Sequence, residues 1–351
     1  MKTYRIGVLP GDGIGEEVVR EGMRVMKALS ERYGFRYESV HYPFGADHFL
    51  ATGEIIPDSA FAEMKKMDAI YLGAIGDPRV ETGKLERGIV GRLRWDLDLY
   101  VNLRPVRLYA EHLCPLKGKK PADLDVLVVR ENTEGIYLGI GGFLRKGTEH
   151  EVATQETIYT RRGVERVIRY AFDACRRRNQ KRKLTLVDKA NAIGAHDLWR
   201  RTFAEVGKEY PDIRTEANYV DATCMWLVKN PESFDTIVTE NMFGDIITDL
   251  GAMLQGGMGI AAGGNIHPGK VSMFEPIHGS APKHRGKNVA NPLAAINAAG
   301  MMLDHLGEEK AAQTLDAAVI KLLNSGKLPS IGTDSGVSTQ KVGDLVLESL
   351  G

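Results

Sequence analysis

Apolar runs of two kinds alternate along this chain. Short continuous runs, of the kind that forms buried strands, lie at residues 4–9, 69–72, 124–129, 184–187 and 234–239. Longer segments with the spacing of amphipathic helices lie at residues 16–33, 161–178 and 198–206. Because strands that alternate with helices usually pair in parallel, the pattern predicts an α/β fold with much parallel sheet.

One polar stretch interrupts this alternation. Gly139-Ile-Gly-Gly142 precedes Thr148-Glu-His-Glu-Val-Ala-Thr154, which fits an extended ribbon with polar side chains on both faces. Such a ribbon has little stability of its own. The sequence contains no internal repeat and no low-complexity linker, so composition alone marks no domain boundary.

The turn Gly11-Asp-Gly-Ile-Gly15 follows the first strand and opens the first helix, which invites comparison with a dinucleotide-binding Rossmann fold. Its third glycine comes one residue too early for the G-x-G-x-x-G pattern. An acidic residue should also end the second strand, whereas Glu38 lies within a weak strand pattern. The sequence therefore predicts that this is not a Rossmann fold.

Composition and charge exclude several classes of protein. The 351 residues carry 46 basic and 46 acidic side chains, which gives no reason to expect nucleic-acid or membrane binding. No apolar run approaches the length of a membrane span, and the N-terminal run is too short for a signal peptide. The basic cluster at residues 176–183 fits a solvated helix end. Three widely spaced cysteines fit reduced thiols in a cytoplasmic protein.

Two aspartates at helical spacing give the first sign of chemistry. Asp245 and Asp249 follow the strand at residues 234–239, and Gly244 offers a turn after which a helix begins. This spacing places both carboxylates on one helical face, where they repel unless a cation lies between them. Oxygen ligands without nearby Cys or His favour Mg²⁺ or Mn²⁺. By spacing alone, the commoner interpretation is a first-turn helix charge beside a solvated surface residue.

Further motifs occur in order over most of the chain. They are Leu9-Pro-Gly-Asp-Gly-Ile-Gly15, Asn102-Leu-Arg-Pro105, Arg130-Glu-Asn-Thr-Glu-Gly-Ile-Tyr137, Asp188-Lys-Ala-Asn191, Asn241-Met-Phe-Gly-Asp-Ile-Ile-Thr-Asp-Leu-Gly251, Phe274-Glu-Pro-Ile-His-Gly-Ser-Ala-Pro282 and Asn288-Val-Ala-Asn-Pro292. Together they resemble the β-decarboxylating dehydrogenases, a family that includes isopropylmalate, isocitrate, homoisocitrate and tartrate/D-malate dehydrogenases. One such string would be weak evidence, but so many in register identify the chain as a member.

The resemblance implies an isopropylmalate/isocitrate dehydrogenase-like fold, in which two α/β domains flank a cleft. Residues 1–103 and 256–351 would form a first domain that carries both termini and most of the cofactor site. Residues 104–255 would form an inserted domain with the dimer interface, the metal ligands and an arm near residues 140–160. The protein would therefore be a homodimer, with its active site shared between subunits, and would act on a small 2-hydroxy acid.

The resemblance also assigns the metal ligands and the substrate clamp. Asp245 and Asp249 would bind Mg²⁺ or Mn²⁺ together with Asp221 of the neighbouring subunit. Three carboxylates neutralise such a cation and leave positions for water and a chelating 2-hydroxy acid. On its own, Asp221 at the end of a strand-like run would be interpreted as a helix N-cap. Planar guanidinium groups would bind the substrate carboxylates, and these belong to Arg94, Arg104 and Arg130.

Tyr137 and Lys189 correspond to the acid–base pair of the family. Lys189, contributed across the dimer, would accept the proton of the C2 hydroxyl as hydride passes to the nicotinamide. After loss of CO₂, Tyr137 would protonate C3 as general acid. Both groups titrate near pH 10 in isolation, so burial and neighbouring charges must tune them. Outside the motifs, the ordinary interpretations would be a solvated loop lysine and a packed tyrosine ring.

The cofactor loop mixes features of two branches. Its residues in this chain are Glu275, His278, Gly279, Ser280, Ala281, Pro282, Lys283, His284 and Asn291. NAD-dependent relatives carry an aspartate after the proline, whereas Lys283 and His284 resemble the pair that meets the 2′-phosphate in NADP-dependent isocitrate dehydrogenases. The stretch at residues 331–339 lacks the matching tyrosine–arginine pair. We therefore expect NAD as cofactor, with measurable use of NADP.

Substrate choice depends on residues 85–91, which should face the C3 substituent. Ile89 and Val90 would form an apolar wall, which favours 3-isopropylmalate over isocitrate. Two stretches, at residues 100–108 and 147–152, look more like the tartrate/D-malate branch, and an inward-pointing Arg87 would favour homoisocitrate. Wall contacts of this kind discriminate by only about 1–3 kcal/mol. The first expectation is therefore 3-isopropylmalate, with tartrate or D-malate as the second.

Two non-catalytic functions fit less well. A regulatory subunit that kept the fold but lost catalysis would lack a metal ligand or a catalytic side chain, and all of these are intact here. A nucleotide-binding module without chemistry would have no need of an arginine clamp beside a metal site.

Overall fold

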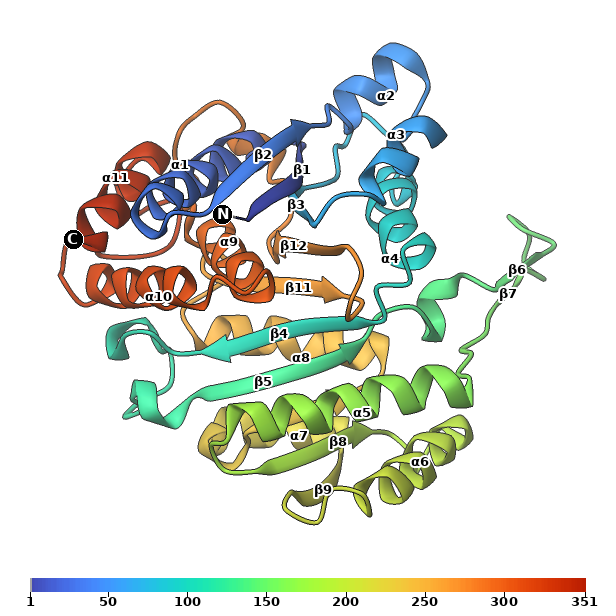
Figure 1. Ribbon diagram of the computed structural model, residues 1–351. Coiled ribbons are helices and arrows are strands. Elements are labelled where there is room, and N and C mark those ends of the chain that lie inside the picture. Colours follow the sequence, from blue (N-terminus) through green and yellow to red (C-terminus); the bar gives the residue numbers. More distant parts are fainter. Residues whose placement is uncertain (1) are drawn as a thin grey trace. The chain divides into compact units, whose positions relative to one another are not determined.

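The computed structural model describes residues 2–351, which form alternating strands and helices in two compact units (Figure 1). Unit 1 contains the residues up to Leu99, Arg104–Leu124 and Ala252–Gly351. Unit 2 contains Tyr100–Leu103 and Asp125–Gly251. The mixed α/β architecture that the apolar pattern predicts is confirmed.

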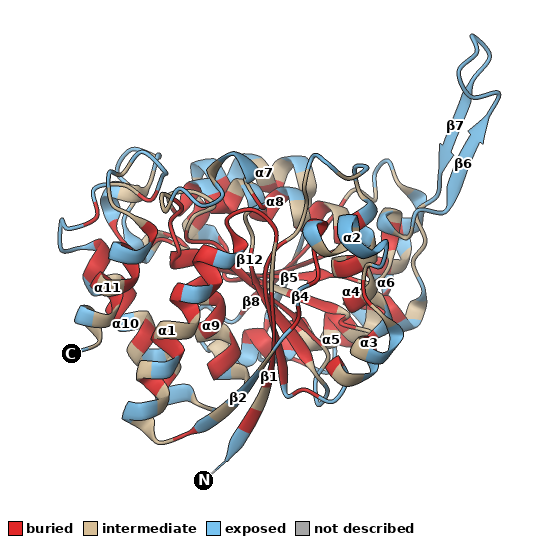
Figure 2. Ribbon diagram, turned by 90° about the horizontal axis from the view of Figure 1, so that it is seen from above, coloured by how far each residue is buried: buried red, intermediate tan, exposed pale blue. Residues whose placement is uncertain are grey.

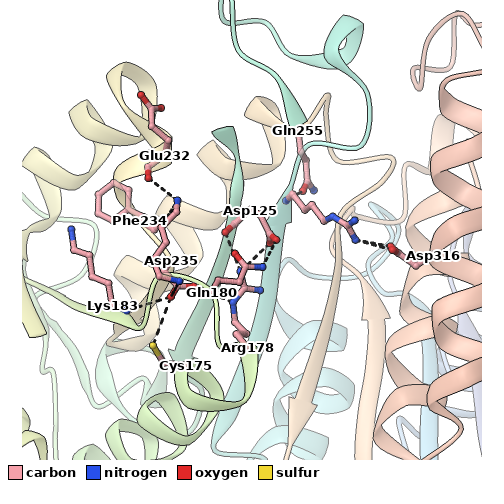
Figure 3. A network of polar contacts seen from close by, with 12 residues as sticks. Asp125, Cys175, Arg178, Gln180, Lys183, Glu232, Phe234, Asp235, Gln255 and Asp316 are labelled. Atoms are coloured by element: carbon pink, nitrogen blue, oxygen red, sulfur yellow. Dashed lines mark hydrogen bonds and ion pairs between the residues drawn. The ribbon is translucent and has the colours of Figure 1, made fainter. Parts of the chain in front are cut away.

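Residues 104–124, which the family resemblance assigns to the inserted domain, cluster instead with unit 1. The backbone N–H of Arg107, at the end of β4 (Val101–Arg107), donates to Gln255 at 2.8 Å. Its guanidinium group pairs with Asp316 at 2.9 Å (Figure 3). These hydrogen bonds tie the segment to the C-terminal part of the chain.

The sheet of unit 1 has the strand order β2-β1-β3-β12-β11. β1 (Thr3–Gly11) pairs in parallel with β2 (Arg36–His41) and with β3 (Ala69–Ala74). β12 (Ser272–Pro276) continues in parallel beside β3, whereas β11 (Ala262–Ile266) runs antiparallel to β12. An antiparallel strand in this order differs from the parallel Rossmann arrangement, so the rejection of that fold is confirmed.

Helices cover this sheet because its central strands, such as β3, are buried on both faces. Tyr71 packs into one buried cluster, whereas its neighbours Ile70 and Leu72 pack into another. The helices of the first cluster are α1 (Gly15–Tyr33), α9 (Leu293–His305), α10 (Glu309–Leu323) and α11 (Thr339–Leu350). After α1, the further helices of unit 1 before β4 are α2 (Ala46–Thr52), α3 (Asp58–Met64), a π-helical turn at Glu86–Gly91 and α4 (Arg92–Asp96).

Four strands of unit 2 pair in parallel, in the order β5-β10-β8-β9. They are β5 (Asp125–Glu131), β10 (Thr236–Thr239), β8 (Lys183–Asp188) and β9 (Arg214–Tyr219). The helices are α5 (Arg161–Arg178), α6 (Asp197–Gly207), α7 (Val220–Lys229) and α8 (Asn241–Leu254). Short 3₁₀ turns occur in both units at Glu111–Leu113, Pro121–Asp123, Gly135–Leu138, Gly194–His196, Pro231–Ser233 and Pro282–His284.

Two predicted helix starts are wrong. α8 begins at Asn241 rather than after Gly244, because the Glu240 carboxylate accepts the first-turn N–H groups of Met242 and Phe243. α7 begins at Val220, so Asp221 lies in the first helical turn and is not the N-cap. Gly244 therefore lies within a helix and makes no turn.

The basic cluster at residues 176–183 is not a simple solvated helix end. Fully buried Asp235 accepts the backbone N–H groups of Lys181 and Lys183 at 3.1 and 3.3 Å (Figure 3). Its carboxylate also lies 3.3 Å from Nε of Arg178, the last residue of α5. The cluster therefore joins the end of α5 to the start of β8.

A hairpin projects from unit 2, formed by β6 (Gly141–Leu144) and β7 (Val152–Gln155), which pair in antiparallel fashion. It is exposed throughout and extends away from the rest of its unit (Figure 2). The prediction of an extended ribbon in this segment is therefore confirmed. Its side chains are not all polar, because Phe143 and Leu144 are 58% and 68% exposed.

All three cysteines are free thiols, as their spacing predicts, and Cys175 is buried. Within residues 2–351, no helix has the length and apolar character that crossing a membrane requires.

Candidate active site

Three of the predicted site residues meet in unit 2. Arg130 lies on β5, Tyr137 lies in the 3₁₀ turn that follows, and Asp245 lies on α8. One Arg130 nitrogen (Nη1) lies 2.5 Å from Oδ1 of Asp245, and the Tyr137 hydroxyl donates to Oδ2 at 3.0 Å. The two oxygens of one carboxylate thus bind a cation and a phenol.

The guanidinium group of Arg130 is fixed in place. Its side chain is only 2% exposed, and Nε and Nη2 both donate to Oδ1 of Asn241, at 3.0 and 2.8 Å. Gly244 makes this approach possible, because a Cβ there would lie 2.4 Å from Cγ of Arg130. Asn241 was missed as a site residue, although it is the first residue of the aspartate motif.

The electrostatics keep the Tyr137 phenol protonated. Partial burial, together with the neighbouring Asp245 carboxylate, raises the pKa of Tyr137 to about 12. Since the ring is 39% exposed, the hydroxyl remains accessible. At neutral pH this group is a proton donor.

A second pair, Lys189 and Asp221, forms elsewhere in unit 2. Lys189 directly follows β8, and Asp221 lies in the first turn of α7. Nζ of Lys189 lies 2.7 Å from Oδ1 of Asp221. The lysine lowers the pKa of that carboxyl, and the Asp221 side chain is 65% exposed. The pair is therefore open to further ligands.

The three aspartates are suitable metal ligands but do not form a complete site in one chain. Asp249 is exposed one turn after Asp245 on α8, as their spacing predicts. However, residues 2–351 contain no group of three or more His, Cys, Asp or Glu side chains placed to hold a metal ion. The oxygen donors fit Mg²⁺ or Mn²⁺ in kind, and a single chain supplies them as two separate parts.

Arg94 and Arg104 line one pocket of unit 1, with a volume of about 160 Å³. Nη2 of Arg94 donates to Oε1 of Glu275 at 2.8 Å, and Asn265 donates to the same oxygen. Nε of Arg94 is buried and has no hydrogen-bond partner within residues 2–351. This pocket offers cationic groups to an anion.

The same pocket has an apolar side. Val90 lines it together with Ile75 and Ile277. Ile89 does not, because it is fully buried in the apolar cluster of unit 1. Arg87 is exposed and lines a separate hollow with Glu81 and Lys84. Of the two residues predicted to form the apolar wall, only Val90 lines the pocket.

The predicted cofactor loop lines this pocket and a larger one of about 400 Å³. His278 and Gly279 line the first pocket, and Gly279–Pro282 line the second. The backbone of Ser280 accepts the N–H of Ile14 at 2.8 Å, and a Cβ at Gly13 would lie 1.9 Å from that carbonyl oxygen. The glycine turn therefore supports the loop.

Orphaned polar atoms make this loop suited to a ligand. Nδ2 of Asn291 and Nε2 of His278 are buried without a hydrogen-bond partner in the described chain, and such atoms are rare unless a ligand or water completes them. Lys283 is exposed and His284 partly so. Arg285, which was not predicted, pairs with Asp47 at 2.6 Å. The donor set suits a dinucleotide with phosphate and ribose groups.

Comparison with known proteins agrees with this geometry. The family model described as isocitrate/isopropylmalate dehydrogenase matches residues 5–346. The chain belongs to this family. The resemblance found in the motifs is therefore confirmed, as is the prediction that the chain is a dehydrogenase enzyme of this family.

Two similar sequences are both named 3-isopropylmalate dehydrogenase. The 3-isopropylmalate dehydrogenase of Thermobifida fusca (strain YX) is 50% identical over 98% of this chain and 96% of that protein. The 3-isopropylmalate dehydrogenase of Frankia casuarinae is 52% identical over 91% of this chain and 92% of that protein.

Similar structures carry other names. The isocitrate dehydrogenase of Methylococcus capsulatus has a TM-score of 0.89 at 36% identity, with 99% of both chains covered. A β-decarboxylating dehydrogenase of Thermococcus kodakarensis has a TM-score of 0.80 at 33% identity, with 99% of this chain and 96% of that chain covered. The predicted isopropylmalate/isocitrate dehydrogenase-like fold is confirmed.

Proposed function

We propose that this chain catalyses the oxidative decarboxylation of 3-isopropylmalate, with NAD and a divalent cation, Mg²⁺ or Mn²⁺. The names of its similar sequences support this substrate. The observation that carries the proposal is the pocket of unit 1, in which two arginines lie beside an apolar wall.

The lining of this pocket discriminates among the family's substrates. An isopropyl group can lie against Val90, Ile75 and Ile277. The third carboxylate of isocitrate would need a further permanently charged cationic partner. Apart from Arg94 and Arg104, the lining contributed by the described residues of unit 1 contains no arginine or lysine. Isocitrate moves ahead of tartrate and D-malate as the second candidate because of the similar solved structure of that name.

Tartrate, D-malate and homoisocitrate fit this pocket less well. Tartrate and D-malate lack an alkyl group at C3 and would leave the apolar wall uncovered. Homoisocitrate would be favoured by an inward-pointing Arg87, and that side chain lines a separate hollow instead.

The described residues then have distinct roles. When bound, the cation would polarise the C2 oxygen and NAD would take up the hydride from C2. Arg94, Arg104 and Arg130 hold the two substrate carboxylates. Lys189 takes the hydroxyl proton, the bond between C3 and its carboxylate breaks with release of CO₂, and the Tyr137 phenol donates a proton to C3.

The division of the site into two parts supports a homodimer with shared active sites. The Tyr137–Asp245 contact and the Lys189–Asp221 contact each supply part of what the reaction needs. Apolar side chains of unit 2 are exposed on α7 and α8, where Met225 is 70% and Ile246 is 52% exposed. Large exposed apolar groups of this kind mark interaction surfaces, and the β6–β7 hairpin is a second such region.

Substrate turnover tests this proposal. Initial rates with Mg²⁺ would be measured on 3-isopropylmalate, D-malate, tartrate, isocitrate and homoisocitrate, each with NAD and with NADP, and with a chelator as control. We expect 3-isopropylmalate with NAD to give the highest kcat/KM and the chelator to abolish turnover. A higher kcat/KM for isocitrate or D-malate would contradict the proposed substrate.

A further inference from the structure

A chain of polar side chains, of which His196 and Glu240 are buried, leads away from Lys189. Its backbone N–H donates to Nδ1 of His196 at 2.9 Å. Because a nitrogen that accepts a hydrogen bond carries no proton, a neutral imidazole must carry its proton on Nε2. Nε2 lies 3.1 Å from the hydroxyl oxygen of Tyr159. His196 therefore donates to Tyr159, whose own hydroxyl hydrogen is left for another acceptor.

That acceptor is Glu240. The Tyr159 hydroxyl donates to its Oε2 at 3.3 Å. The same carboxylate accepts the backbone N–H groups of Met242 at 3.0 Å and Phe243 at 2.6 Å. These donors belong to the first turn of α8, the helix that carries Asp245. Hydrogen bonds thus run continuously from the Lys189 backbone to the start of α8.

Packing keeps these groups in one arrangement. His196 is 1% and Glu240 is 3% exposed. The Tyr159 ring meets the rings of His196 and Trp199 edge-on, with centroids 5.4 and 5.9 Å apart. The rings of His196 and Phe243 also meet edge-on, with centroids 5.5 Å apart. Burial lowers the pKa of His196, which agrees with the neutral form that the hydrogen bonds require.

We propose that His196, Tyr159 and Glu240 are positioning residues that hold the Lys189 backbone in place relative to the N-terminus of α8. The inference rests on the proposed function for the roles of Lys189 and Asp245. In the homodimer proposed above, these two residues of one chain serve different active sites. The three side chains would then join the two sites through a continuous series of hydrogen bonds.

Two substitutions at His196 separate its two hydrogen bonds. His196→Asn keeps an acceptor near the position of Nδ1 and loses the donor to Tyr159. His196→Gln keeps a donor near the position of Nε2 and loses the acceptor for Lys189. In the protein without substrate, we expect amide hydrogen exchange at Lys189 to be about tenfold faster in His196→Gln and nearly unchanged in His196→Asn.

Kinetics should follow the same order. A displaced Lys189 should lower kcat about 10- to 100-fold in His196→Gln with little change in KM, because misplacement affects the chemical step. His196→Asn should retain more of kcat. Equal behaviour of the two variants, in exchange and in kcat, would overturn the positioning role and leave His196 as a packing residue.

Tyr159→Phe tests the middle of the path with the ring retained. In this variant we expect a lower kcat at unchanged KM. In the wild type, we expect nitrogen NMR to show that neutral His196 carries its proton on Nε2. A proton on Nδ1, or unaltered kcat in Tyr159→Phe, would refute the proposed path. Exchange and NMR need no substrate, so they stay informative if 3-isopropylmalate is not turned over, an outcome that would refute the proposed function instead.

Discussion

The side chains of unit 2 that we propose for proton transfer each have a charged neighbour. The Asp245 carboxylate binds both the Tyr137 phenol and the Arg130 guanidinium group, so its charge is shared between a donor and a cation. With a pKa raised to about 12, Tyr137 keeps its proton at every working pH. Lys189 has a carboxylate partner of its own in Asp221. The geometry therefore separates the acid from the base.

Tyr137→Phe should remove the proton donor and keep the ring, which lies 5.7 Å from the Arg130 guanidinium carbon. We expect kcat to fall about 10²- to 10⁴-fold with little change in KM, as for loss of a general acid. Steady-state kinetics measures this effect. Tyr210→Phe is the matched control, because its hydroxyl donates to Asp173 instead. An unchanged kcat would exclude Tyr137 as the proton donor.

Glu131 should make stability depend on pH. Burial raises the pKa of its carboxyl to about 7 in the folded protein, against an ordinary value of 4.5. Between these values the folded state holds a proton that the unfolded state has released, so stability falls as pH rises from about 4.5 to 7. The loss should be at most about 3 kcal/mol.

Urea unfolding of the wild type and Glu131→Gln at pH 5 and at pH 8 measures this dependence. The variant cannot release a proton at this position, so its loss of stability over this range should be smaller than that of the wild type. The same pH dependence in both proteins would show that Glu131 ionises normally.

At the scale of elements, local signals set the boundaries that the sequence predicts well. The helix predicted at residues 161–178 is found at Arg161–Arg178, because Thr160 caps its first turn and Asn179 adopts the left-handed conformation at its end. The strands β1 and β8 were evident for a different reason. They are buried on both faces, so their sequences are continuous apolar runs.

Where distant residues decide, the sequence was insufficient. The Glu240 cap at the start of α8 is a local signal, but the packing of the buried Arg130 side chain against Gly244 depends on the fold. The motifs identified both aspartates of α8 and the arginines. They did not identify Asn241 or the partners of His196, because only the fold brings β5 beside α8 and the residues after β8 beside Tyr159.

Gly244→Ala should disturb both stability and the site. Its Cβ would lie 2.4 Å from Cγ of Arg130, so the buried arginine must move. We expect a loss of about 1–3 kcal/mol in urea unfolding, together with a raised KM. Gly207→Ala at the end of α6 is the control, because its Cβ would make only ordinary contacts, the nearest at 3.5 Å. Equal stability of the two variants would contradict this packing account.

Lys283 should decide how well NADP is used. The side chain is exposed in the cofactor loop, at the position where NAD-dependent relatives carry an aspartate. Lys283→Asp should therefore lower kcat/KM for NADP and raise the NAD preference about tenfold. Lys287→Asp, an exposed lysine four residues later, is the control. If the NAD/NADP ratio is the same in both variants, Lys283 does not contact the 2′-phosphate.

At the scale of the whole molecule, one chain contributes two different parts of the proposed chemistry. Tyr137 and Asp245 form one part, and Lys189 and Asp221 form the other. We propose that a working site takes parts from two chains, and the lack of a group of three metal-binding side chains within residues 2–351 supports this proposal. A homodimer with twofold symmetry would contain two identical sites of this kind.

Subunit complementation tests this central claim most directly. Lys189→Ala and Asp245→Asn should each be inactive, since one lacks the base and the other a metal ligand. After verified subunit exchange of an equal mixture, each mixed dimer should contain one intact site, so activity should return to about one quarter of the wild-type value. Lys189→Ala mixed with Asp221→Asn should regain none, because both defects then lie in the same part. Recovery in the first mixture alone is the predicted result, and no recovery in either mixture would contradict the shared active site.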